Sequence, residues 1–170
     1  MICKTIQHTK VLKYLQDCNK YYVPKNAPLP PNLVEPYRFM MKHYNYKHRP
    51  IFLAPVGYYV NFCGAALDNT CLITLDIPNR YIKIQDYYMW SDFIYFSEMP
   101  HEIQQTYNVH NVNELGRNVL GQFKGGIEKN DTVYQAITQF LLKSWVRKIE
   151  RLTPEFIDAY IDTGGVNILK

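Results

Sequence analysis

The sequence lacks the long apolar runs that cross membranes. No stretch reaches the about 18 consecutive apolar residues that a transmembrane helix needs. Its first residues also lack an apolar stretch followed by a small-residue cleavage site, so we expect no secretory signal there. We therefore expect a cytoplasmic protein with no membrane partner.

Paired cysteines and metal-ligand motifs are absent as well. The four cysteines show no C-x-x-C spacing and no neighbouring histidine that would complete a zinc pattern. They are Cys3, Cys18, Cys63 and Cys71. We expect them to be reduced and mostly buried, which suits a reducing cytoplasm. His43 and His48 are five residues apart and would lie on different faces of a helix, so no metal site is predicted.

Sequence signatures of catalysis are missing too. There is no Walker loop, no Rossmann fingerprint, no nucleophile elbow and no metalloprotease helix. Gly125-Gly126 is too short to hold a phosphate and predicts a turn. Asp76 lies in the strongest predicted strand, and we expect a structural contact with Arg80, the nearest basic residue. Whether the protein is an enzyme stays open.

What the sequence does contain is enough apolar material for one folded domain. Of its 170 residues, 47% are hydrophobic and 20% are charged. A chain of this length buries roughly 70% of its extended surface on folding. The segments predict a single α+β domain over residues 1–170, with a small, mostly antiparallel sheet packed against helices.

The first 131 residues alternate between strand and helix patterns. The expected strands are Ile2–Gln7, Ile51–Leu53, Tyr58–Phe62 and Cys71–Ile77, with a short extended piece at Tyr81–Ile84. The expected helices begin at the cap Thr9, near Asn32 or Glu35, at Tyr87 after the cap Asp86, and near Asn113.

The last forty or so residues show helical spacing. Hydrophobic side chains recur every three or four residues at Ile137, Leu141, Trp145, Ile149 and Leu152. This spacing predicts a long helix from Thr132 to about Leu152, capped by Asp131. Thr153-Pro154 predicts the start of a further short helix that ends at Gly164-Gly165.

Tyrosine and charge are unevenly used. Fifteen tyrosines against eight phenylalanines indicate either amphipathic strands or a binding face. Residues 1–50 carry nine Lys or Arg and only two acids, a net +7, whereas residues 51–170 carry a net −3. Basic and aromatic residues interleave in this first part, as at Lys20-Tyr21-Tyr22, which would also suit nucleic-acid binding.

Several short segments resemble an uncharacterised bacterial and phage family, domain of unknown function 3841. They are Thr5-Ile6-Gln7, Pro50-Ile51-Phe52, Leu75-Asp76-Ile77-Pro78 with Asp86 and Trp90, and Ser144-Trp145. The opening strand and helix are also similar to those of ADP-ribosyltransferase-like proteins. In those proteins a polar residue on the first strand and an aromatic residue contact NAD, and a glutamate completes the site.

The resemblance implies a cleft that binds NAD or a related nucleotide. The residues expected to line it are Gln7, His8, Tyr22, Arg49 and Trp90. No glutamate falls on a predicted late strand, because Glu128, Glu150 and Glu155 fall in predicted loop or helix. The cleft would therefore serve binding, with or without transfer chemistry.

Three functions follow from the sequence. The first is a non-enzymatic protein-binding module, such as a phage- or toxin-linked inhibitor of a host protein, because tyrosine is abundant and a catalytic pattern is lacking. The second is the nucleotide-binding domain just described. The third is a nucleic-acid binder that uses the basic N-terminal third.

Overall fold

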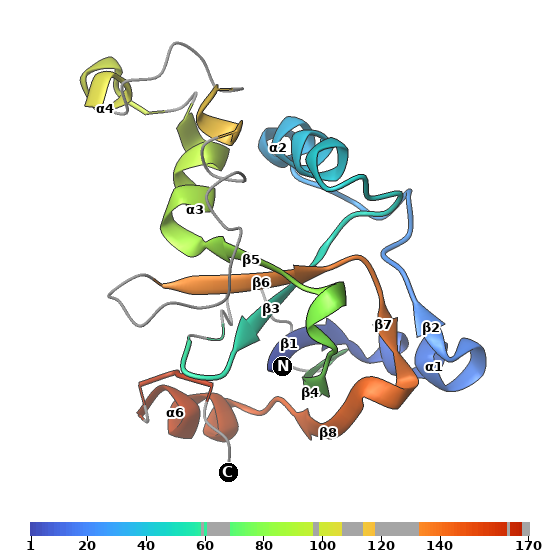
Figure 1. The fold of residues 1–170 in the computed structure, drawn as a ribbon. Coiled ribbons are helices and arrows are strands. Elements are labelled where there is room, and N and C mark those ends of the chain that lie inside the picture. Colours follow the sequence, from blue (N-terminus) through green and yellow to red (C-terminus); the bar gives the residue numbers. More distant parts are fainter. Residues whose placement is uncertain are drawn as a thin grey trace.

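The computed structural model of the 170-residue chain describes residues 1–58, 60, 69–96, 99–106, 114–117, 133–162 and 164–167. These residues form an α+β fold around an antiparallel sheet (Figure 1). The predicted fold class is therefore confirmed. No helix among these residues has the length and apolar character needed to span a membrane.

The main sheet has six strands in the order β5-β6-β3-β1-β4-β8. Their bounds are β1 Ile2–His8, β3 Ile51–Pro55, β4 Thr70–Asp76, β5 Lys83–Asp86, β6 Tyr134–Thr138 and β8 Val146–Arg151. A small second sheet pairs β2 (Lys20–Tyr21) with β7 (Leu141–Leu142). The opening strand β1 thus lies inside the sheet, between β3 and β4.

Five helices accompany the sheet in the described part of the chain. They are α1 (Thr9–Cys18), α2 (Pro31–His43), α3 (Tyr87–Tyr95), α4 (His101–Thr106) and α6 (Pro154–Asp162). Residues 114–117 form a further helical turn. The helices α2 and α3 lie together on one side of the view in Figure 1, and α6 lies on the other side.

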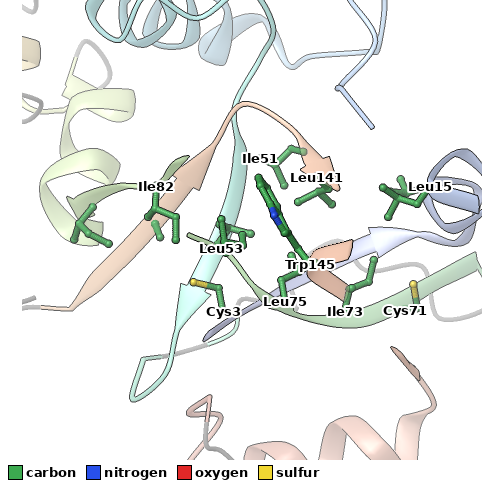
Figure 2. Packing of buried hydrophobic residues seen from close by; sticks show 14 of the residues in the cluster. Cys3, Leu15, Ile51, Leu53, Cys71, Ile73, Leu75, Ile82, Leu141 and Trp145 are labelled. Atoms are coloured by element: carbon green, nitrogen blue, oxygen red, sulfur yellow. The ribbon is translucent and has the colours of Figure 1, made fainter. Parts of the chain in front are cut away.

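One face of the sheet carries the main core. Side chains from α1 and from the short helical turn η4 (Lys143–Trp145) pack on alternate residues of the strands. Figure 2 shows Trp145 among Ile51, Leu53 and Leu75. These side chains are nearly or fully buried, so this face is closed to solvent.

The opposite face is covered in two separate places. Phe52 of β3 and Ile137 of β6 pack with Met40 of α2 and Trp90 of α3. Two residues along β3, Ala54 belongs to another cluster with Leu72 and with the apolar side of α6. Because Phe52 and Ala54 point to the same face, the two groups of helices flank a strip of sheet between them.

The predicted long helix at Thr132–Leu152 is wrong. The segment forms β6, β7, η4 and β8 instead, and its described residues pair with strands from earlier in the chain. The β-branched and aromatic run from Val133 to Thr138 is buried almost throughout, which suits a central strand. The helical spacing of the hydrophobic residues was therefore a chance feature, because pairing with distant strands holds the segment extended. Ile149, one of the residues that suggested a buried stripe, is 48% exposed.

Smaller differences concern element ends. The cap of α1 is His8, whose Nδ1 accepts a hydrogen bond from the Lys10 amide at 3.0 Å, and the predicted cap Thr9 is the first helical residue. Tyr58 and Val60 are not in a strand, and residues 61 and 62 lie outside the described part. The same holds for Gly125, Gly126 and Asp131.

The cysteines and Asp76 agree in part with the predictions. Cys3 and Cys71 are buried thiols, whereas Cys18 is exposed and Cys63 lies outside the described residues. Asp76 does make a structural ion pair, but its partner is Arg147 at 2.7 Å and not Arg80. The pairing of β4 with β8 brings Arg147 close to Asp76.

Candidate functional site

The candidate site begins where two neighbouring strands separate. β1 and β3 are paired only at Cys3–Pro55 and Lys4–Ala54. Farther along β1, the hydroxyl of Thr5 donates a hydrogen bond to the Phe52 carbonyl at 2.8 Å. The side-chain amide of Gln7 in turn donates to the Thr5 hydroxyl at 2.9 Å. Polar side chains thus satisfy backbone groups at the place where the strand ladder opens.

A cavity of about 840 Å³ lies along this opening. Its walls come from β1, from α2 and the loop before it, from β3 and the residues just before it, from α3 and from β6. Its volume is within the range of roughly 300–1,000 Å³ that is typical of small-molecule sites. It occupies the strip of sheet that the helices leave between them.

Aromatic rings form one wall of the cavity. Tyr37, Phe52 and Trp90 contact one another, with ring centroids 5.8 to 6.1 Å apart. Tyr88 and Tyr95 also line the cavity and are 59% and 48% exposed, which places them at its rim. Flat rings at a cavity wall offer stacking surfaces to an aromatic ligand.

The charged side chains of the described lining are both basic. They are Lys4 and Arg49, and no described lining residue carries a carboxylate. Burial lowers the pKa of Lys4 from its usual value, and nearby Glu150 opposes this shift. The Lys4 ammonium also lies 5.2 Å from the centre of the Tyr160 ring. The cavity therefore favours ligands with negative charge.

Arg49 is held firmly by backbone carbonyls. Its guanidinium donates to Pro24 at 3.1 Å, to Pro28 at 3.2 Å and to Ala27. These bonds fix the proline-rich loop that forms one end of the cavity. Arg49 thus shapes the site and leaves part of its donor set for a ligand.

Tyr37 adds a neutral hydroxyl to the same wall. Burial raises the pKa of its phenol to about 12, against an opposing effect of Arg49. The phenol therefore keeps its proton at neutral pH and can donate a hydrogen bond.

Three of the five predicted site residues meet in this cavity. Gln7, Arg49 and Trp90 line it, although they come from β1, the segment before β3 and α3. His8 and Tyr22 do not line it. His8 caps α1, and Tyr22 stacks on the His48 ring at 4.4 Å between centroids.

Sequence reasoning missed several members of the site. Lys4, Tyr37, Phe52 and the two rim tyrosines line the cavity but were not predicted. Alternation along β1 offered a signal for Lys4, since a lysine on a central strand must face a polar or open space. The tyrosines of α3 could be placed only once the sheet order was known.

The glutamate prediction needs one correction. Glu150 lies on the late strand β8, and not in a helix as its spacing suggested. Its carboxylate pairs with Lys148 at 2.9 Å, and Glu150 does not line the cavity. Glu155 is in α6 as expected, and Glu128 is outside the described residues.

Within the part of the chain that the structure describes, no three His, Cys, Asp or Glu side chains gather as metal ligands.

Comparisons of the chain with models of known protein families, with curated proteins and with solved structures found no match.

Proposed function

We propose that the cavity between β1 and β3 binds NAD or a related nucleotide. The observation that carries the proposal is the meeting of Gln7, Arg49 and Trp90 on one cavity with an aromatic wall and a basic lining. A flat base would stack on the exposed rings, and the anionic part would be attracted by Lys4 and Arg49. The residues on the cavity thus fit the ligand that the resemblance implies.

Tryptophan fluorescence provides a direct test. The chain has two tryptophans, Trp90 on the cavity and Trp145 in the core on the other face of the sheet. In a Trp145→Phe variant, the signal comes from Trp90 alone. Titration with NAD or AMP should quench it with saturation at micromolar to millimolar ligand. An unchanged Trp90 signal and unchanged thermal melting at millimolar nucleotide would rule the proposal out.

A rim variant locates the ligand. Tyr88→Ala removes an exposed ring that stacks on the base, and each such stacking contact contributes about 1–3 kcal/mol. We expect a roughly tenfold or larger rise in Kd. The matched control is Tyr14→Ala, because Tyr14 is 55% exposed on α1 and does not line the cavity. Equal affinities of the two variants would contradict the assignment.

A protein partner is the second candidate function. Tyr88 and Tyr95 lie seven residues apart on α3, so both project from one side of that helix at the cavity rim. Exposed tyrosines are enriched at protein interfaces. Affinity capture with the wild type and with a Tyr88→Ala/Tyr95→Ala variant tests this function. A protein retained equally by both variants, or by neither, would count against it.

Nucleic-acid binding is the third candidate, and it remains tied to the +7 charge of residues 1–50. It predicts that affinity for short DNA or RNA falls steeply with salt. Binding that is absent at low salt would remove it.

A further inference from the structure

A second cavity of about 400 Å³ adjoins the first. It lies beside α2 and the segment before β3. The two cavities share Leu29, Tyr37 and Arg49 as lining residues. The two cavities therefore lie next to each other, with these three residues between them.

Several basic side chains stand around the smaller cavity. Its charged lining consists of Lys25, Arg38, Lys47 and Arg49, to which His48 adds an imidazole. None of the described residues that line it is acidic. Its floor is apolar, formed by residues such as Val34 and Met41, so the cations stand around a surface of low polarity. Charges beside a low-dielectric surface attract anions more strongly than charges in open water.

The four basic residues differ in how many ion pairs and hydrogen bonds they already make within the protein. Arg38 pairs with Glu35 on the same helix, and both side chains are largely exposed. The guanidinium of Arg49 donates hydrogen bonds to three backbone carbonyls. Lys25 and Lys47 are exposed and have no ion-pair partner among the residues that the structure describes. These two lysines are therefore available to an incoming anion.

Tyr22 contacts one lining residue of this cavity. Its ring stacks on His48, a lining residue, and also contacts Phe140 and the Lys20 ammonium. The Nδ1 atom of His48 is buried and makes no hydrogen bond with the described residues. Tyr22 thus positions a wall of the second cavity, although it does not line the first.

We propose that the second cavity is a phosphate subsite, in which Lys25, Lys47 and Arg49 bind a phosphate group of the ligand held in the first cavity. The ligand is then a nucleotide with an extended phosphate chain, whose base lies on the aromatic wall. This inference rests on the proposed function and adds the class of ligand. It gives the lysines of the loop before α2 and of the loop before β3 a common role.

The test compares ligands that differ only in phosphate. Adenosine, AMP and ATP are titrated, free of metal, against the Trp145→Phe protein at low salt. Affinity should rise from adenosine to ATP by at least about tenfold, and this gain should shrink as salt is raised. Equal affinity for the three ligands would overturn the phosphate subsite and leave the base-binding cavity intact. Absence of binding by all three would contradict the proposed function itself.

Charge variants assign the effect to the cavity. Lys25→Gln/Lys47→Gln should remove most of the advantage of ATP over adenosine. Lys10→Gln/Lys13→Gln is the matched control, since it removes the same charge from α1, away from both cavities. An equal loss in the two double variants would show that overall charge, and not this cavity, attracts the phosphates, and would overturn the proposal.

Discussion

At the scale of single residues, the hydroxyl of Thr5 holds two strands together where their backbones no longer pair. It accepts from Gln7 and donates to Phe52, and Thr5 is only 3% exposed. A buried polar group that loses its partner costs about 1–3 kcal/mol. The hydroxyl of Thr5, a lining residue of the cavity, is therefore expected to stabilise this junction of β1 and β3.

Thr5→Val tests this dependence. Valine keeps the volume but leaves the Phe52 carbonyl and the Gln7 amide without the hydroxyl. We expect the free energy of unfolding to fall by about 1–3 kcal/mol, measured by urea denaturation. Thr5→Ser retains the hydroxyl and should lose clearly less. A serine variant as unstable as the valine variant would point to packing and not to hydrogen bonding.

Asp76 provides a pH-dependent prediction. The hydrogen bond from Arg147 is the main cause that holds the pKa of this exposed carboxyl below its usual value of 3.8. A carboxyl with a lower pKa in the folded chain stabilises that chain above the unfolded pKa and loses this effect as pH falls through the folded pKa. Between pH 5 and pH 2, Asp76→Asn should therefore lose less stability than the wild type, as followed by urea midpoints.

High salt is the control for the Asp76 prediction, because it screens an exposed ion pair and should reduce the difference between the two proteins. Identical pH profiles at low salt would contradict the assigned role of Arg147.

At the scale of helices and strands, local signals predicted those elements whose ends are fixed by neighbouring residues. β1, β4, α1 and α3 were all found within a residue or two of their expected positions. The cap Asp86 was right because its carboxylate meets an amide only three residues away. The helix predicted after residue 132 was wrong because the strands of this segment are fixed by partners that lie about 50 to 120 residues earlier in the chain.

Removal of the α3 cap should weaken this element measurably. The Asp86 carboxylate accepts a hydrogen bond from the Met89 amide at 2.9 Å. Asp86→Ala should lower the free energy of unfolding by about 1 kcal/mol, within a range of roughly 0.5–2. Asp86→Asn keeps a capping oxygen and should stay close to the wild type, as measured by thermal and urea unfolding. Equal losses in both variants would show that charge, and not capping, matters.

The same helix links the cap to the cavity. α3 carries Trp90, Tyr88 and Tyr95, so fraying of its first turn would disturb one wall of the site. We therefore expect weaker nucleotide binding in Asp86→Ala as well, provided the proposed function holds.

At the scale of the whole molecule, the C-terminal residues return to the middle of the chain. Asn167 is fully buried, and its side-chain amide donates to the Ala54 carbonyl at 2.9 Å. Its backbone also bonds to Gly57 and Tyr58, at 2.7 and 2.8 Å. The end of the described chain thus closes the turn that follows β3.

Two variants of Asn167 test this closure. Asn167→Ala removes the donor to Ala54 and should destabilise the fold by about 1–3 kcal/mol. Asn167→Asp keeps the size but buries a charge and should destabilise it more. The order wild type, alanine, aspartate in urea midpoints is the expected result. An aspartate variant as stable as the wild type would mean that this residue is exposed in solution.

The candidate site could be predicted only in part for a reason that belongs to the same scale. Gln7 and Arg49 lie next to features that the sequence itself shows. Gln7 is at the end of a predicted strand, and Arg49 precedes Pro50. Trp90 follows a recognisable cap. Lys4 and Tyr37 become neighbours of these residues only through the order of strands, which no local pattern specifies.

The strand order has a consequence for how the protein is made. During translation β3 and β4 leave the ribosome long before β6 and β8, the partners that cover their open edges. Until about residue 151 has emerged, one edge of each of these apolar strands lacks its partner. Premature termination before that point would release a polypeptide with unprotected strand edges, and such fragments should aggregate where the complete chain folds.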